Sequence, residues 1–327
     1  MTGVRTRPED LDEARLLRAL GEWGILATSL EYAPVGFGDH HWIARDDAGE
    51  KWFLTVADLE LRGARDPGAA LRSLRGAMDT AAALHDEGHL DFVVAPLRTA
   101  GGRTVDRLGP RYALSVFPFV DGVSGDFDRP WTSRERGAVV ELLAALHRQA
   151  PPASVPVLDL GLSMRGLLES ALDDTIRWAR GPFAEPARTL LSGHAAAIRR
   201  QVKEFDRLAG DVRGGGRPPV LTHGEPHPGN LLWRDGRPLL VDWDTVGLAP
   251  PERDLWSVAQ GTEDLEHYAE AGGRTADASA LALYRLRWDL EEISSYVDWF
   301  RAPHDRSADT EEAWQDLLES VENLSQG

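Results

Sequence analysis

Alternating apolar and polar residues over the first third of the chain predict short strands with two helices among them. The helices are expected at 8–23, which carries a stripe of leucines, and at 69–87, which a glycine follows. Turns rich in Gly and Asp separate the strands. The expected strands are residues 30–35, 41–45, 51–56, 92–96, 103–107 and 111–117. This part of the chain is therefore predicted to form one small antiparallel sheet with a helix against it.

After about residue 120 the pattern changes to that of helices. Helices are expected at 133–149, 164–179, 185–208, 276–299 and 310–324, and short apolar strands at 220–222, 231–233 and 239–241. The 327 residues exceed the length at which a single core stops growing, roughly 250–300 residues. We therefore expect an α+β protein of two lobes, a sheet lobe at 1–119 and a mainly helical lobe at 120–327.

Charge and composition narrow the class of partner. The chain carries 36 Lys and Arg against 53 Asp and Glu, a formal charge of −17 at pH 7. This surplus argues against nucleic acid and against an anionic membrane surface. It would attract a small cationic molecule, and the alternative, which the charge alone favours, is that it merely keeps the protein soluble. The absence of Cys excludes disulfides and thiolate chemistry. No apolar run approaches the ~20 residues of a membrane span, so a cytoplasmic protein is expected.

Candidate chemistry concentrates in one loop and in the strand end that follows it. The loop holds Glu225 and, five positions later, Asn230, and the strand ends in Asp242. Phosphoryl transfer needs this set, because a carboxylate takes the proton of the acceptor while an Asn and an Asp hold Mg²⁺ against the phosphates. His223 and His227 flank Glu225, but the Gly and Pro residues around them exclude the helix on which a zinc-binding His pair lies.

These residues carry a family resemblance. His223-Gly-Glu-Pro-His-Pro-Gly-Asn230 and Val241-Asp-Trp243 resemble the aminoglycoside phosphotransferase family, whose loop reads H-G-D-x-H-x-x-N and whose metal-binding strand ends in I-D-W or I-D-F. Leu248-Ala-Pro-Pro-Glu-Arg-Asp-Leu255 is similar to the same stretch of spectinomycin phosphotransferase-like members. The resemblance covers nearly the whole chain. It implies a bilobal protein-kinase-like fold, ATP or GTP and Mg²⁺ as cofactors, and a hydroxyl group as acceptor.

The resemblance also implies roles for single residues of the loop. Glu225 would be the general base and His223 would brace the loop, while Asn230 and Asp242 would bind Mg²⁺. Asp254 is expected to anchor the loop through its backbone rather than to touch the substrate.

On the nucleotide side, the resemblance makes 1–119 the nucleotide-binding lobe and assigns catalysis and substrate binding to the second lobe. Gly36 and Gly38, between the first two strands, would form the loop that covers the phosphates. Phe117 and Phe119 would belong to the hinge, where backbone groups hold the adenine.

Two positions depart from the family pattern. Glu225 stands where the family has Asp, which moves the carboxylate outward by one methylene, ~1.5 Å. Thr55 stands where the third strand should carry a phosphate-binding Lys, and Lys51 lies four residues too early to replace it. The following helix has Arg75 where the carboxylate partner of that Lys is expected. We therefore expect Arg75, or its neighbour Arg72, to hold the nucleotide phosphates, and a solvated helix face is the alternative.

The acceptor side is expected on the helix at 276–299. This helix mixes the carboxylates of Asp289 and Glu292 with the rings of Trp288 and Trp299, which suits an amino sugar or aminocyclitol through ion pairs and cation–π contacts. The alternative is an ordinary amphipathic helix with a core stripe and a solvated face.

The sequence therefore predicts an O-phosphotransferase that uses ATP or GTP with Mg²⁺ on a small, cationic hydroxyl compound. An aminoglycoside or aminocyclitol such as spectinomycin is the first expectation, which makes antibiotic resistance the expected role. A kinase of homoserine- or choline-like metabolites is one alternative. A pseudokinase-like binding or scaffold protein in a biosynthetic pathway is the other, favoured by Thr55. The presence together of Glu225, Asn230 and Asp242 favours an enzyme.

Overall fold

The computed structural model describes residues 7–36, 38–62, 66–126, 129–173, 178 and 180–326. The chain forms two compact units. The sheet unit comprises residues up to 158 together with 219–275, and the helical unit comprises 159–218 together with 276–327. The expected lobe boundary at residue 120 stays a prediction.

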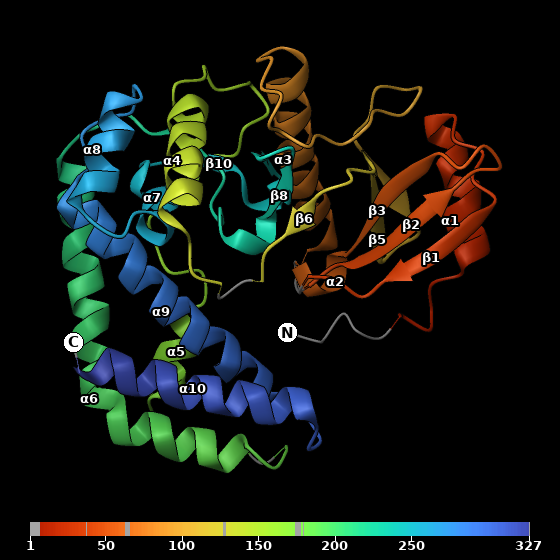
Figure 1. Ribbon diagram of the computed structural model, residues 1–327. Coiled ribbons are helices and arrows are strands. Elements are labelled where there is room, and N and C mark those ends of the chain that lie inside the picture. The colour runs from red at the N-terminus through yellow and green to blue at the C-terminus, as the bar shows by residue number, and fades with distance from the viewer. Residues whose placement is uncertain are drawn as a thin grey trace. The chain divides into compact units, whose positions relative to one another are not determined.

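The sheet unit begins with a five-stranded antiparallel sheet of order β1-β2-β3-β5-β4 (Figure 1). Its strands are β1 (Ser29–Ala33), β2 (His40–Arg45), β3 (Lys51–Asp58), β4 (Val105–Leu108) and β5 (Tyr112–Pro118). The turn between β2 and β3 closes at Gly49, whose φ of 84° lies in the left-handed region that favours glycine. The predicted sheet is confirmed, and β3 lies at its centre, between β2 and β5.

The sequence prediction was wrong for one strand. Residues 92–96 do not join this sheet. The backbone of Phe92 and Val94 instead pairs with Leu240 on β9 (Arg237–Leu240) over one short bridge. Pro96, which has no N–H to donate, ends the extended run.

One helical segment precedes the first strand of the sheet, and two more helices lie between β3 and β4 in the sequence. The first predicted helix is shorter than expected: α1 (Glu13–Ala19) starts at its Asp12 cap and continues as the 3-10 helix η1 (Leu20–Trp23). Its leucines pack with Trp42, Leu54 and other buried strand residues in one apolar cluster. The short α2 (Leu59–Arg62) follows β3 directly, and α3 (Pro67–Asp86) then buries a long apolar face.

The remainder of the sheet unit carries the predicted loop. Its helices are α4 (Ser133–His147), α7 (Glu252–Val258) and α8 (Thr262–Glu270), with 3-10 turns η2 (Pro228–Asn230) and η3 (Trp243–Thr245). Its strands are β6 (Val123–Ser124), β7 (Val220–Thr222), β8 (Leu231–Arg234), β9 and β10 (Gly247–Ala249). β7 pairs with β10, and β8 lies between β6 and β9. The sequence pattern did not predict α2, α7 or α8, because helices of four to nine residues show too little periodicity.

The helical unit packs α5 (Arg165–Ala171), α6 (Ala184–Gly214), α9 (Ala278–Arg301) and α10 (Ala308–Gln326) around one apolar core (Figure 1). The predicted helix at 164–179 is confirmed only as α5, and its positions 174–177 and 179 lie outside the described residues. α6 runs past the predicted end at 208 as far as Gly214. Among the described residues, no helix is both long and apolar enough to cross a membrane.

Candidate active site

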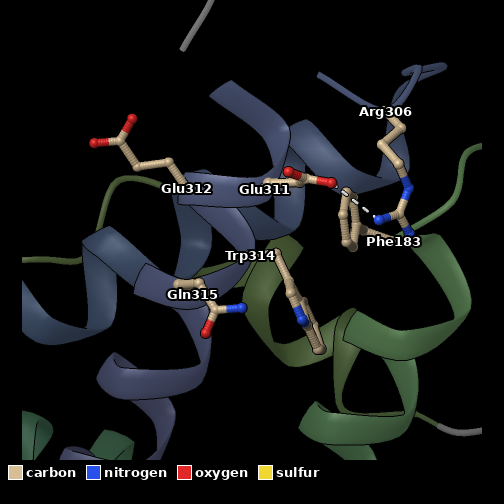
Figure 2. Close-up of a pocket in the computed structure, with 6 residues that line it drawn as sticks. All are labelled: Phe183, Arg306, Glu311, Glu312, Trp314 and Gln315. Atoms are coloured by element: carbon tan, nitrogen blue, oxygen red, sulfur yellow. Dashed lines mark hydrogen bonds and ion pairs between the residues drawn. The ribbon is translucent and has the colours of Figure 1, made fainter. Parts of the chain in front are cut away.

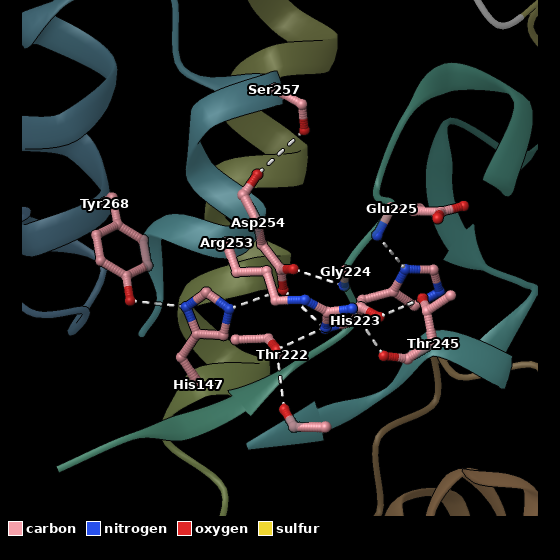
Figure 3. A network of polar contacts seen from close by, with 11 residues as sticks. His147, Thr222, His223, Gly224, Glu225, Thr245, Arg253, Asp254, Ser257 and Tyr268 are labelled. Carbon is pink, nitrogen blue, oxygen red and sulfur yellow. Dashed lines mark hydrogen bonds and ion pairs between the residues drawn. The ribbon is translucent and has the colours of Figure 1, made fainter. Parts of the chain in front are cut away.

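The loop that follows β7 is fixed through its backbone by one buried carboxylate (Figure 3). Asp254 on α7 is fully buried, and it accepts the N–H of His223 at 2.8 Å and the N–H of Gly224 at 2.6 Å. Burial opposes its ionisation, but the hydrogen bond and charge of His147 and the charge of Arg253 outweigh burial and lower its pKa. The predicted anchoring role of Asp254 is confirmed.

The anchor continues away from the loop into two helices. His147, at the end of α4, bonds through Nε2 to Oδ2 of Asp254 at 3.0 Å, the oxygen that also accepts the N–H of His223, and through Nδ1 to the hydroxyl of Tyr268 on α8 at 2.7 Å. All three side chains are buried. Because an ionised carboxylate can only accept, Nε2 of His147 donates to Asp254, while Nδ1 joins the ring to the tyrosine hydroxyl. The loop is thus tied to α4, α7 and α8 together.

His223 braces the loop in its neutral form. Its Nε2 donates to the carbonyl of Val241 at 2.9 Å, and its Nδ1 accepts the N–H of Glu225 at 3.3 Å. Burial lowers its pKa, which agrees with a ring that donates on one side and accepts on the other. The ring also meets Trp243 edge-on, with 4.8 Å between centroids. The side chain therefore holds the start of the loop against the strand end that carries Asp242.

Gly224 is required where the loop turns. Its φ is 109°, and a Cβ added to it would overlap the guanidinium of Arg253. That guanidinium donates to Thr222 Oγ1 at 3.0 Å and to the carbonyl of Thr245 at 2.9 Å. The side chain of Arg253 therefore packs against the turn before Glu225 and also links β7 to η3.

Glu225 and Asn230 are brought together by the five-residue spacing between them. Asn230 is 9% exposed at the end of η2, and its Nδ2 donates to the backbone carbonyl of Glu225 at 3.0 Å. This bond leaves Oδ1, the atom suited to a metal, without a hydrogen-bond donor among the described residues. The side chain of Glu225 is half-buried and points away from the anchor network in Figure 3. His227 lies on the same loop, and burial lowers its pKa to about 4.

Asp242 stands among other carboxylates just after β9. Its φ is 62°, a conformation that turns the chain sharply at this point. The residue is exposed to solvent, but protein atoms crowd its carboxylate. The charge of Asp244 is the largest cause of a pKa well above the usual value, followed by desolvation and by the charges of Asp39 and Glu225, while Arg62 opposes them. A divalent cation would relieve this repulsion.

Asp242 and Asn230 offer oxygen donors of the kind that binds Mg²⁺. Within the described ranges no group of three or more His, Asp or Glu side chains is arranged to enclose a metal ion. Mg²⁺ is usually held by one or two carboxylates and by substrate phosphates rather than by an all-protein cage. Asp242 and the Oδ1 of Asn230 are donors of that kind. The set therefore fits a metal that arrives with a nucleotide.

On the phosphate side, Gly36 and Gly38 have φ values of 74° and 92°, as a tight loop requires, and Phe37 between them lies outside the described residues. Thr55, at the position expected for Lys, hydrogen-bonds to Nδ1 of His41 at 3.2 Å. His41 is stacked on Phe53, and burial lowers its pKa to about 4, so this partner of Thr55 is uncharged at neutral pH. The pair supplies no cation.

The residues expected at the hinge lie at the end of β5 and just after it. Phe117 is buried opposite Phe53 of β3, and Phe119 follows the strand. Nζ of Lys51 lies 4.9 Å from the centroid of the Phe119 ring. Lys51 is therefore engaged at the hinge end of β3, which agrees with the prediction that it cannot replace the missing strand lysine.

The arginines expected to replace that lysine lie on α3. Arg72 is exposed and pairs with Asp66 at 3.4 Å. Nε of Arg75 is buried and has no hydrogen-bond partner among the described residues. Neither makes an ion pair with a described residue of the loops that contain Asp39 and Asp244.

Sequence reasoning missed a different cation, Arg62, at the end of α2. Its Nε and Nη2 donate to the two oxygens of Asp39 at 3.0 and 2.7 Å, and Nη2 also lies 2.6 Å from Oδ2 of Asp244. Burial raises the pKa of Asp39 to about 6 even though Arg62 opposes this shift. The only sequence signal was an arginine soon after the central strand, and nothing in its spacing marked its partners.

The four residues expected on the acceptor side lie on α9 of the helical unit and are half-buried. Glu292 accepts the hydroxyl of Ser320 at 2.9 Å, and burial raises the pKa of Asp289. Trp299 packs against the core and stacks on Phe300, as the amphipathic-helix alternative requires, and Trp288 lies nearer the start of α9.

A hollow of about 540 Å³ lies elsewhere in the helical unit (Figure 2). Phe183, Arg306 and Trp314 are among the residues that line it, and Arg306 pairs with Glu311 at 3.0 Å. None of the four residues expected on the acceptor side lines this hollow.

Comparison with solved structures gives the fold. Spectinomycin phosphotransferase, solved with ADP and spectinomycin, is 19% identical and superposes with a TM-score of 0.74 over 97% of this chain and 98% of that one. Amicoumacin kinase, solved with AMP-PNP, Ca²⁺ and its substrate, is 15% identical with a TM-score of 0.62, covering 96% of this chain and 94% of that one. At these identities the likeness concerns the fold, and it confirms the predicted bilobal kinase-like class.

Comparison of sequences gives the family. Protein StrN of Streptomyces griseus is 30% identical over 300 residues, 88% of this chain and 85% of that protein. Stress response kinase A of Salmonella typhi is 33% identical over 177 residues, 52% of this chain and 47% of that protein. The model of the phosphotransferase enzyme family matches residues 30–292. With the anchored loop and the carboxylates beside it, this match shows that the chain belongs to the phosphotransferase enzyme family.

Proposed function

We propose that this protein transfers the γ-phosphate of ATP or GTP, with Mg²⁺, to a hydroxyl group of a small cationic molecule. The observation that carries the proposal is the loop 223–230. Asp254 fixes its backbone, Asn230 is hydrogen-bonded to Glu225, and the charge of Glu225 acts on Asp242. A base and one metal donor on an anchored loop, with a second metal donor after β9, are the parts that phosphoryl transfer requires.

In the proposed reaction, Glu225 accepts the proton of the substrate hydroxyl while that oxygen attacks the γ-phosphorus in line. The new O–P bond forms as the bond between the γ-phosphorus and the β,γ-bridging oxygen breaks, and the nucleoside diphosphate leaves. Asn230 and Asp242 would hold the metal, which would neutralise the negative charge that develops in the transition state. His223 and Asp254 act before the reaction by fixing the position of the base.

A cationic aminocyclitol or a related amino compound is the acceptor class that we favour. Support comes from the formal charge of −17, from the half-buried carboxylates of Asp289 and Glu292 on α9, and from the substrates named for the two solved relatives. Burial raises the pKa of Asp289, and a substrate ammonium group would offset that cost of ionisation.

The proposal is tested by replacing the base and measuring release of nucleoside diphosphate against a panel of amino-sugar, aminocyclitol and amino-alcohol acceptors. Glu225→Gln keeps the shape of the side chain but cannot take a proton, so turnover should fall about 1,000-fold or more while nucleotide affinity is kept. Asp235→Asn is the matched control, because Asp235 is an exposed acid in the turn between β8 and β9. Retained turnover in Glu225→Gln would show that the base is elsewhere.

The presence of Thr55 keeps a second function in view, that of a pseudokinase-like binding protein. Its hydroxyl bonds to a neutral histidine and leaves the strand without the usual phosphate-binding cation. The two functions differ in one result. A binding protein is stabilised against heat by Mg·ATP but releases no ADP with any acceptor of the panel, whereas the phosphotransferase releases ADP with at least one.

A further inference from the structure

The proposed nucleotide site in the sheet unit lacks the phosphate-binding lysine expected on β3, where Thr55 stands. A triphosphate carries several negative charges, and the described site already holds the carboxylates of Glu225, Asp242, Asp244 and Asp39. Of the two lysines in the chain, Lys51 lies over the Phe119 ring and Lys203 belongs to α6 in the helical unit. A side chain other than lysine must therefore offset the charge of the phosphates.

Arg62 reaches both loops that would flank those phosphates. It lies on α2, directly after β3, the strand that carries Thr55. Its guanidinium bonds to Asp39, which follows the glycines of the β1–β2 loop, and to Asp244, two residues after Asp242. These are the glycine loop and the metal loop of the proposed site. The guanidinium therefore supplies, from a neighbouring element, the positive charge that the central strand lacks.

The guanidinium also has donors left for a ligand. Its bonds to Asp39 and Asp244 use Nε and Nη2, and neither N–H of Nη1 has a partner among the described residues. The side chain is 29% exposed, although both of its carboxylate partners are more deeply buried. A planar fork fixed on one edge by Asp39 presents its remaining donors in a set direction, and that geometry matches phosphate oxygens.

We propose that Arg62 binds the nucleotide phosphates in place of the missing strand lysine. Asp39 orients the guanidinium and Asp244 joins it to the metal loop. This inference rests on the proposed function, since it names the residue that holds the co-substrate of that reaction. It also replaces Arg75 and Arg72 as the first candidates, because neither of them forms an ion pair with Asp39 or Asp244, whereas Arg62 pairs with both.

The test is binding of ATP, ADP, AMP and adenosine to the full chain, measured by calorimetry without an acceptor. Loss of a charge-assisted hydrogen-bonding group should weaken ATP binding by Arg62→Ala about 10- to 100-fold and leave adenosine binding within about twofold. Arg62→Lys keeps the positive charge but not the planar guanidinium, so its affinity for ATP should lie between those of the parent and Arg62→Ala. Arg45→Ala is the matched control, because Arg45 is a partly buried arginine at the end of β2 that is likewise paired with a carboxylate, that of Glu31.

A double variant tests whether Arg62 contacts the phosphates directly or only neutralises carboxylates that would repel them. Asp39→Asn removes one of the two carboxylates that Arg62 neutralises, so an indirect effect of Arg62 should shrink in that background. Loss of ATP affinity that persists when Arg62→Ala is added to Asp39→Asn supports direct contact. Loss that disappears overturns it.

The remaining outcomes separate this inference from the proposed function. If the parent protein binds ATP and Arg62→Ala binds it equally well, Arg62 is not the phosphate-binding residue, while the proposed function stands. Equal weakening of ATP and adenosine also overturns the inference, because the effect is then not on the phosphates. If the parent protein binds neither ATP nor GTP, both proposals fail.

Discussion

The two halves of the candidate site are held in opposite ways. The loop 223–230 is fixed by buried groups: Asp254 accepts two of its backbone N–H groups, and His147 and Tyr268 continue the network into α4 and α8. The proposed phosphate side is held by one partly exposed arginine, Arg62, between two carboxylates, Asp39 and Asp244. Glycines with positive φ precede Asp39, and one of them, Gly38, has open space around it.

This difference between the two halves indicates which part of the site has to be rigid. A base that takes a proton in the transition state acts only at the correct distance, and a displacement of about 1 Å can cost about 100-fold in rate. A group that holds phosphates binds a large, multiply charged ligand and tolerates a change of residue type and of origin along the chain. Asn230 and Asp242 match the family pattern and Glu225 keeps a carboxylate, whereas Thr55 replaces the cation of the strand altogether.

Replacing Asp254 should have the largest effect on the rigid half. In Asp254→Asn the amide cannot supply the charge that His147 and two N–H groups face, so the free energy of unfolding should fall by about 3–5 kcal/mol. Turnover should fall about 100-fold at temperatures where the variant is folded. Urea unfolding and steady-state kinetics, with Asp235→Asn as control, measure both. A variant as stable as its parent would show that the anchor contributes nothing.

Substituting glycine in each half compares the two directly. In Gly224→Ala the new methyl group meets the guanidinium of Arg253 and φ is 109°, so the loss of stability should reach about 3 kcal/mol. In Gly38→Ala the φ of 92° is equally unfavourable, but no heavy atom lies within 4 Å, and about 1–2 kcal/mol is expected. Urea unfolding of the two variants side by side is the measurement. Equal losses would mean that packing around the catalytic loop is not tighter than around the glycine loop.

The smallest effect concerns the start of α4, the helix that carries His147. Glu135 forms a capping box with Thr132 and pairs with Arg129 at 2.8 Å, and chiefly the bonds from Arg129 lower its pKa from 4.5 to about 2. A lowered carboxylate pKa stabilises the fold fully above pH 4.5, and this contribution is lost as pH falls toward 2. Glu135→Gln should cost about 1 kcal/mol at pH 7.

The pH dependence checks the cause of that effect. The difference in unfolding free energy between the parent and Glu135→Gln should shrink steadily when urea unfolding is repeated from pH 5 to pH 3. A difference that stays constant over this range would assign the effect to the shape of the cap and not to its charge.

Some of this architecture was predictable because its cause is local. Strand alternation located most of the sheet, and a leucine stripe located the helix that covers it. The strand at 92–96 was misplaced because an apolar run shows that a segment is extended and buried but not which strand it pairs with. Helices α7 and α8 were missed because elements this short show no period, and packing stabilises them.

The amino-acid sequence alone was enough to identify the candidate catalytic and metal-binding residues and the family. Glu225 and Asn230 lie within one short loop, so their spacing alone brings them together, and the resemblance to phosphotransferases was readable from them. Only the tertiary structure decided how the loop is anchored and where a phosphate-side cation lies. Asp254 reaches His223, and Arg62 reaches Asp39 and Asp244, across long stretches of chain. Such pairings have no period along the sequence, because they depend on which buried charges the folded chain brings within hydrogen-bonding distance.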